Sequence, residues 1–307
     1  MKGLKQTRTV IHRTTYRYET ATDFSKQIGV LIPTINEVML NGPFRKGQCT
    51  LSQHITVEPE PAILMSYHDY LMNTLTHFEI TYPHDHLSVT SQCEVDVYSA
   101  ILNADTIQMA NTPSWSQIAQ ELKYTANQPI LFDTVFRFPS KHVKLFKQAK
   151  DFGLIEFQPD RPIVEATFGL MNTIFKEFKY TQGATHINTP VIEVFNTRKG
   201  VCQDFAHFML SVLRSLGLSA RYVSGYMLTD PPPGKEKLIG ADASHAWVSL
   251  WCGKQIGWVD FDPTNNKLPD QRYVTTALGR DYADIPPLRG IVFGGGKHEL
   301  KVEVTVT

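Results

Sequence analysis

The sequence has little of the features that reveal a nucleic-acid or membrane partner. Its 30 basic and 30 acidic residues cancel, and no block of like charge stands out. A chain without excess positive charge lacks the attraction to phosphates that drives non-specific nucleic-acid binding and adhesion to anionic membranes. No apolar run approaches the length of a membrane span, and the polar N-terminus lacks the apolar stretch of a signal peptide. We therefore expect neither nucleic acid nor membrane as a partner.

Paired cysteines and metal-binding patterns are also missing. The cysteines show neither CxxC pairing nor zinc-ligand spacing, and they stand at Cys49, Cys93, Cys202 and Cys252. Free thiols of this kind favour a reducing, cytoplasmic setting. His84 and His86 have a metal-like spacing without a third ligand nearby, so we interpret them as part of a polar turn. We expect no metal and no cofactor.

What the sequence does have is enough apolar material for a large core. Hydrophobic residues make up 42% and aromatic residues 11% of its 307 positions, which suffices for one large domain or two ordinary ones. Apolar and polar residues alternate in four early stretches, at 9–18, 49–58, 74–80 and 87–97. Such alternation is typical of half-buried antiparallel strands. We expect a β-sandwich-like domain over residues 1–105.

After residue 100 the pattern changes from strands to helices. Helical signals begin at Ser114 and continue at 140–150, 162–180 and 190–195. Strand-like alternation then returns, at 220–227, 245–251, 257–262 and 300–306. This order predicts an α+β second half with helices packed on an antiparallel sheet. We expect a helical connecting region over 106–160 and a core over 161–307 that includes the C-terminal strand.

A cysteine stands at the start of a strongly amphipathic helix. Apolar residues recur three and four apart from Phe205 to Leu216, and Gly217 stands where a C-terminal cap belongs. Cys202 therefore falls in or just before the first turn. Unpaired backbone N–H groups and the positive end of the helix dipole favour an anion there, so this position suits a reactive thiolate.

A nucleophilic thiolate needs a base, and the base needs an orienting group. His245 and Asp262 supply these types on the two arms of a predicted hairpin, where they can come within hydrogen-bonding reach. Asp260 shares the strand and the face of Asp262 and competes with it, although we favour Asp262. His207 follows Cys202 on the same helix and would point along it, so we interpret His207 as structural.

An acyl-transfer site also needs donors for the oxyanion that forms during the reaction. The backbone N–H of Cys202 can supply one, and Tyr180 or, less favoured, Gln203 can supply a second. Asp204 is expected to serve the first turn of the helix and its dipole, with a role in shaping the site as the alternative. The proline-rich loop at 230–240 lies between two of these strands, where it is either a specificity element or a stiff connector.

At these positions the sequence resembles the bacterial transglutaminase-like superfamily of cysteine enzymes. The family motifs are a Gly-x-Cys helix start, a His-Ala-Trp strand that here includes Trp247, and an Asp-Pro-Thr strand end. The matching segments are 200–207, 220–226, 242–248 and 257–265. Residues 11–18 and 83–89 also resemble the β-rich region that precedes this core in the bacterial subgroup.

The resemblance implies a papain- or transglutaminase-like cysteine-hydrolase core. It makes Cys202 the nucleophile, His245 the general acid/base and Asp262 the orienting carboxylate, with Trp247 as a site-shaping residue. It implies acyl transfer through a thioester on a peptide, protein or other amide substrate, and we expect hydrolysis by a protease or amidase. The alternatives are amine-dependent crosslinking of glutamine to lysine, or a peptide-binding scaffold without catalysis.

Overall fold

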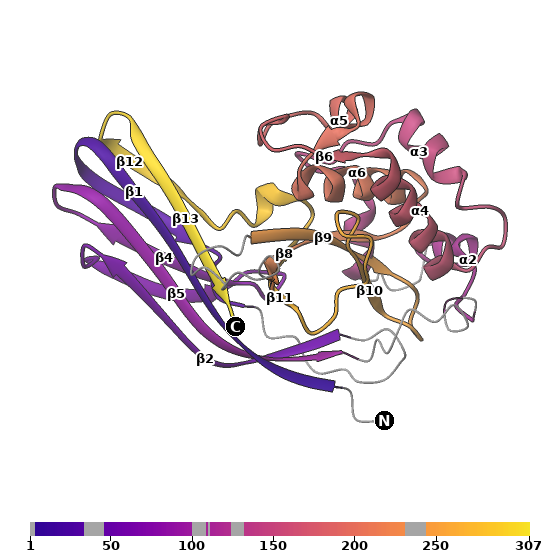
Figure 1. The fold of residues 1–307 in the computed structure, drawn as a ribbon, viewed down its shortest axis with the longest axis horizontal. Coiled ribbons are helices and arrows are strands. Elements are labelled where there is room, and N and C mark those ends of the chain that lie inside the picture. Colours follow the sequence, from indigo (N-terminus) through magenta and orange to yellow (C-terminus); the bar gives the residue numbers. More distant parts are fainter. Residues whose placement is uncertain (1–3, 34–45, 100–108, 110, 124–131, 231–243) are drawn as a thin grey trace.

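The computed structural model describes residues 4–33, 46–99, 109, 111–123, 132–230 and 244–307. Within them, a seven-stranded antiparallel sheet stands beside a four-stranded antiparallel sheet that carries the helices (Figure 1). The expected α+β class is thereby confirmed, with the N-terminal part taking the form of one curled sheet. Every helix among these residues is too short or too polar to cross a membrane. The expected boundary at residue 105 and the proline-rich part of the loop at 230–240 lie outside the described residues.

The seven-stranded sheet is organised around one long strand, β1 (Leu4–Gly29). β5 (His84–Ser99) pairs mainly with its first part and β4 (Thr74–Ile80) with its last part. β2 (Lys46–Glu58) extends the sheet beyond β5, and β3 (Ile63–His68) extends it beyond β4. All six residues of β3 are exposed, so this strand lacks the alternation that would have predicted it.

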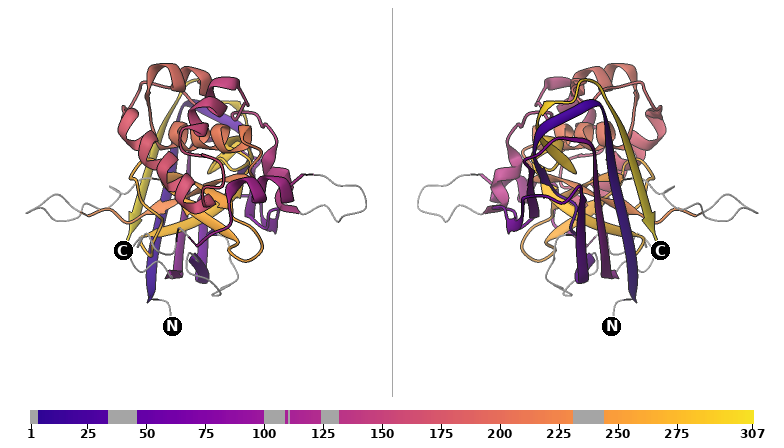
Figure 2. Two further views of the ribbon diagram at one scale, coloured as in Figure 1. Left: turned by 90° about the vertical axis from the view of Figure 1, so that its right-hand side faces the viewer. Right: turned by 90° about the vertical axis from the view of Figure 1, so that its left-hand side faces the viewer.

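The last two strands of the chain belong to this first sheet. β12 (Leu288–Gly294) and β13 (His298–Val306) pair antiparallel with β1, beside which they run in both views of Figure 2. The expected division gave the C-terminal strand to the core, so the pairing corrects that assignment. β12 and β13 pair with the edge of β1 that β5 and β4 leave free. Val306 of β13 lies opposite Val10 of β1, and both belong to one buried apolar cluster. Alternation predicts that a strand forms but not which strand it pairs with.

The second sheet has the order β10-β9-β8-β11. Its strands are β8 (Ala220–Met227), β9 (Ser244–Trp251), β10 (Trp258–Phe261) and β11 (Tyr273–Gly279). The helices are α2 (Trp115–Glu121), α3 (Lys147–Leu154), α4 (Ile163–Glu177), α5 (Val191–Thr197) and α6 (Cys202–Ser215). The short elements are η1 (Phe132–Arg137), β6 (Lys179–Tyr180), β7 (Lys199–Gly200) and η2 (Tyr282–Asp284). These five helices and the four strands of the second sheet share one large apolar cluster, in which α6 packs on β8 and β9.

α6 is buried on nearly all sides rather than along one stripe. Every residue from Asp204 to Arg214 is buried, including polar side chains that the amphipathic pattern would place in solvent. Those side chains are satisfied by hydrogen bonds: Arg214 donates to the backbone oxygen of Ala220 at 2.8 and 3.0 Å, and Ser211 donates to that of Lys144. The helix that carries Cys202 is therefore the centre of its half of the molecule.

The helix expected at 140–150 begins only at Lys147. The preceding residues are held in an irregular path by tertiary contacts. Val143 is buried, the backbone N–H of His142 donates to Asp281 at 2.7 Å, and the backbone oxygen of Lys144 accepts from Ser211. These contacts cover the polar side of α6, and they override the local helical preference.

The burial of β13 gives a test of its place in the first sheet. Val304 is 1% exposed and Val302, on the same face of the same strand, is 47% exposed. We expect Val304→Ala to lower the free energy of unfolding by about 2 kcal/mol, because it removes two buried carbons and leaves a cavity. Val302→Ala should cost less than about 0.7 kcal/mol. Urea unfolding measures both, and equal effects would contradict this placement of β13.

Candidate active site

Cys202 is the first residue of α6, and its side chain is partly exposed. The backbone enters the helix through β7, whose Gly200 pairs in parallel with Tyr180 of β6. At the other end Gly217 has a φ of 83°, a left-handed conformation that favours glycine and ends the helix. The thiol therefore lies at the N-terminus of a fixed, buried helix.

Asp204 closes the first turn of this helix. Its Oδ2 accepts hydrogen bonds from the backbone N–H of Val201 at 2.8 Å and from the hydroxyl of Thr185 at 2.6 Å. Burial raises the pKa of Asp204, although these two donors oppose the shift. A Cβ on Gly200 would lie 2.6 Å from the same carboxylate oxygen, so the turn leaves no room for a side chain there.

His245 and Asp262 are brought together at the end of the hairpin β9–β10. His245 Nε2 lies 2.8 Å from Asp262 Oδ2, and the Asp262 side chain has 0% exposure. Burial lowers the pKa of His245, but hydrogen bonds and charge interactions with Asp262 and Cys202 outweigh burial and raise the pKa to about 10. His245 is thus hydrogen-bonded to Asp262, and the charge of Cys202 contributes to its raised pKa.

A tight turn after β10 holds the Asp262 carboxylate. Asp262 Oδ1 accepts the backbone N–H groups of Thr264 at 2.9 Å and Asn265 at 3.3 Å, an arrangement that Asp before Pro commonly forms. Asp262 Oδ2 also accepts from the Asn265 side-chain amide at 2.7 Å and from the Tyr273 hydroxyl at 2.8 Å. Burial would raise the pKa of Asp262, but His245, Asn265 and Tyr273 outweigh burial and lower it. The carboxylate is therefore held in its ionised form.

Asp260, the competing carboxylate, binds a different partner. Its Oδ2 accepts a hydrogen bond from Trp247 Nε1 at 3.0 Å. The fully buried Trp247 ring lies 6.1 Å from the His245 ring, and it leaves no space for a Cβ on Gly225, which would come within 2.5 Å of it. Trp247 therefore supports the histidine, and Asp260 fixes Trp247.

Two tyrosines lie near the thiol. Tyr180 is 49% exposed, and its pKa is raised by partial burial and then by the charge of Cys202. Tyr222, which sequence reasoning missed, is buried on β8, and its pKa is raised well above its usual value by burial and then by Cys202. Gln203, the other expected oxyanion donor, is half-buried in the first turn of α6.

Two other histidines singled out from the sequence contact residues other than Cys202, His245 and Asp262. His207 is buried between the rings of His142 and Tyr222, and its Nε2 accepts the backbone N–H of Tyr282 at 3.2 Å. Burial lowers the pKa of His207 to about 3, which keeps it neutral. His84 bonds to Thr22 and Ser25. Within the described parts of the chain, no three metal-ligating side chains cluster.

Like Tyr222, Tyr273 and Asn265 were not singled out from the sequence, although both bond the Asp262 carboxylate. Asn265 follows the Asp-Pro-Thr motif directly, and its closeness to Asp262 was the available signal. Tyr273 begins β11, in which all seven residues are buried, so no alternation marked the strand.

Comparison with known proteins places the chain in a class. The fold is shared with a structure from Cytophaga hutchinsonii, provisionally named a cysteine protease, which superposes with a TM-score of 0.71 at 20% identity, covering 99% of this chain and 92% of that one. The profile of the transglutaminase-like superfamily matches residues 156–263, and that of the bacterial transglutaminase-like N-terminal region matches residues 9–96. The chain belongs to the transglutaminase-like superfamily.

Relatives extend over nearly the whole chain. An uncharacterized protein of Mycobacterium tuberculosis is 38% identical over 300 residues, covering 97% of this chain and 90% of the relative. One of Mycobacterium leprae is 30% identical over 311 residues, covering 97% of each. A protein-glutamine gamma-glutamyltransferase of Pseudomonas aeruginosa is 38% identical over 104 residues, which is 31% of this chain and 15% of that protein.

Two histidines should give stability slopes of opposite sign with pH. Between about 8.5 and 10 the unfolded chain has released both the imidazole proton of His245 and the thiol proton of Cys202, whereas the folded protein still keeps one proton on His245. Stability should therefore fall as pH rises in that window, by at most about 1.4 kcal/mol per unit, and His245→Asn should flatten the slope. Between about 3 and 6.5 the unfolded chain protonates His207 and the folded chain does not, so stability should rise with pH.

Urea unfolding at a series of pH values measures both slopes. His207→Phe is the matched control, because it should flatten only the acidic one. An unchanged alkaline slope in His245→Asn would contradict the protonated state assigned to His245.

Proposed function

We propose that the protein is a thiol hydrolase, a protease or amidase, in which Cys202 is the nucleophile, His245 the general acid/base and Asp262 the orienting carboxylate. The observation that carries the proposal is that His245 interacts with both other groups at once. It bonds to Asp262 at 2.8 Å, and both Asp262 and Cys202 raise its pKa. A base oriented by a buried carboxylate and facing a helix-terminal thiol is what thiol catalysis requires.

The protonation states follow from the bonding. An ionised carboxylate can only accept, so His245 donates its Nε2–H to Asp262. This leaves Nδ1 as the ring nitrogen for the thiol. The high pKa of His245 favours transfer of the thiol proton to Nδ1, which gives a thiolate beside an imidazolium.

The reaction proceeds in two halves. The Cys202 thiolate attacks the carbonyl carbon of an amide, and the resulting oxyanion is held by the backbone N–H of Cys202 and a second donor, for which Tyr180 and the buried Tyr222 are candidates. The imidazolium of His245 gives its proton to the departing amine, leaving a thioester. Neutral His245 then removes a proton from water, whose oxygen attacks the thioester, releasing the carboxylic acid and the thiolate.

Peptides, proteins and other amides are the proposed substrates. The name of the Cytophaga structure, a cysteine protease, supports hydrolysis at the level of the shared fold. The four free thiols support the cytoplasmic setting proposed from the sequence. Residues 1–105, the connecting region 106–160 and the core 161–307 remain the proposed division, except that the last two strands pair with the first sheet.

Alkylation tests the nucleophile directly. Near neutral pH, Cys202 should react with iodoacetamide at least about tenfold faster than Cys49, which is also partly exposed, because only Cys202 has an imidazolium partner. His245→Ala should remove most of this advantage, and peptide mass mapping identifies the labelled cysteine. Equal labelling of Cys202 and Cys49 in the folded protein would exclude an activated nucleophile.

Amine-dependent crosslinking is the second candidate, because the Pseudomonas relative is named a protein-glutamine gamma-glutamyltransferase. A labelled primary amine offered with a glutamine-containing protein distinguishes the two outcomes. Under hydrolysis we expect ammonia release without amine incorporation, and Cys202→Ala should abolish that release. Incorporation that outpaces hydrolysis would establish transfer. A biological effect of the protein that persists in Cys202→Ala would instead favour a binding scaffold without catalysis.

A further inference from the structure

The N-terminal sheet reaches the backbone of β11, the strand that carries Tyr273. β11 is an edge strand: among the described residues it pairs only with β8, so its other side presents backbone N–H and C=O groups outward. Two buried side-chain amides from the first sheet meet those groups, Gln48 on β2 and Asn73 just before β4.

Each amide makes two hydrogen bonds to one residue of β11. Gln48 Nε2 donates to the Thr275 oxygen at 2.6 Å, and its Oε1 accepts the Thr275 N–H at 2.8 Å. Asn73 Nδ2 donates to the Leu278 oxygen at 2.8 Å, and its Oδ1 accepts the Leu278 N–H at 2.8 Å. At two positions along β11, a side-chain amide thus makes the hydrogen bonds that a neighbouring strand would make. The two attachments prevent β11 from sliding along its own axis.

Asn73 is itself fixed within its turn. Asp69 Oδ1 accepts the backbone N–H of Asn73 at 2.9 Å, and Asp69 Oδ2 accepts from the Asn73 side chain at 2.8 Å. Gln48 lies on β2 in register with Val97 of β5. Both amides are therefore anchored in the first sheet before they meet β11.

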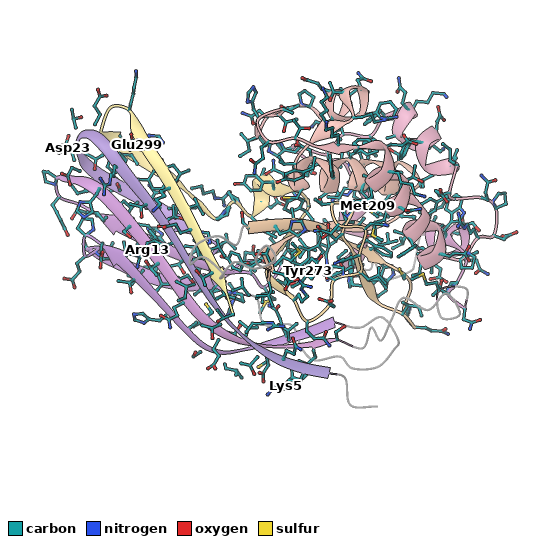
Figure 3. The ribbon with its side chains drawn as sticks, viewed as in Figure 1. Lys5, Arg13, Asp23, Met209, Tyr273 and Glu299 are labelled. Atoms are coloured by element: carbon teal, nitrogen blue, oxygen red, sulfur yellow. The ribbon has the colours of Figure 1, made fainter. Side chains whose placement is uncertain are left out.

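Tyr273 connects this contact to the candidate active site. It lies two residues before Thr275, is buried, and donates its hydroxyl to Asp262 Oδ2 at 2.8 Å, the same oxygen that His245 contacts. Figure 3 places Tyr273 at the junction of the two halves, whereas Met209 of α6 lies within the helical half. A displacement of β11 would withdraw this donor from the buried carboxylate.

We propose that Tyr273 is a positioning residue for the His245–Asp262 pair and that Gln48 and Asn73 of the N-terminal sheet hold the strand that carries it. The proposal rests on the proposed function and gives the N-terminal sheet a part in it. The sheet completes the catalytic half by setting the position of β11, through the path Gln48, Thr275, Tyr273, Asp262 and His245.

The test compares variants along this path in the full-length protein. The rate constant for iodoacetamide at Cys202 should fall about tenfold in Tyr273→Phe, because a hydrogen bond to a charged group is lost. Gln48→Ala and Asn73→Ala should each lower it several-fold. Because all three act through one link, adding Gln48→Ala to Tyr273→Phe should lower the rate less than about twofold further.

The matched control is Val89→Ala. Val89 is buried in an apolar cluster made of first-sheet residues and Leu31, just after β1, so its truncation weakens the same sheet without touching β11. We expect a melting temperature lowered as in the amide variants and an unchanged rate at Cys202. A rate that falls equally in Val89→Ala would show general destabilisation and overturn the proposal. The proposal would also be overturned if the rate reductions of Gln48→Ala and Tyr273→Phe multiplied in the double variant.

A second readout separates this proposal from the proposed function. The pKa of His245, followed by NMR, should fall in Gln48→Ala and in Asn73→Ala, because the carboxylate that raises it is less well held, and should stay unchanged in Val89→Ala. If wild-type Cys202 proves unreactive, the proposed function fails while this titration still decides the positioning role. An unchanged His245 titration in both amide variants refutes that role whatever the reactivity of Cys202. Should one amide variant not fold, the other and Tyr273→Phe carry the test.

Discussion

The catalytic half of the structure depends on hydrogen bonds that compensate the charge of the Asp262 carboxylate, which is buried away from water. A buried charge costs several kcal/mol unless it is paired and hydrogen-bonded. The compensation comes from three places: two backbone N–H groups and a side-chain amide from the turn after β10, His245 from β9, and the Tyr273 hydroxyl from β11. Because these donors lie on separate strands, the carboxylate is stable only when the turn and both strands are in place. Assembly of the sheet and assembly of the site are one event.

The thiol is positioned by a different kind of interaction. Cys202 lies on α6, whose place over β8 and β9 is set by apolar packing and by an aromatic group around Phe208. The Phe208 ring lies 5.2 Å from that of Phe152 and 4.9 Å from that of Phe178. The guanidinium of Arg198, just before β7, lies 4.0 to 5.4 Å from three rings of this group. Packing thus fixes the helix that carries Cys202, whereas hydrogen bonding fixes the ring of His245.

The sequence predicted the parts of this site that depend on local pattern. Helical periodicity and Gly217 located the helix of Cys202, and strand alternation with an Asp-Pro turn located His245 and Asp262. It did not predict β11 or β3, because one is buried throughout and the other exposed throughout, and neither alternates. It also did not predict that β12 and β13 join β1, or that Gln48 meets Thr275. Those pairings join residues far apart in the chain, and local pattern carries no information about them.

The bulge in β11 explains why side chains rather than a strand cover its outer edge. The register with β8 shifts between Thr275 and Ala277, which places an extra residue between the two points that Gln48 and Asn73 contact. A regular strand would lose its pairing across that bulge, because an extra residue on one side disrupts the ladder. Two separate amides from different parts of the first sheet can bond the backbone groups of one residue each, Gln48 before the bulge and Asn73 after it. The same bonds cover an edge that would otherwise be open to other chains, so one contact both protects the sheet and sets Tyr273 against Asp262.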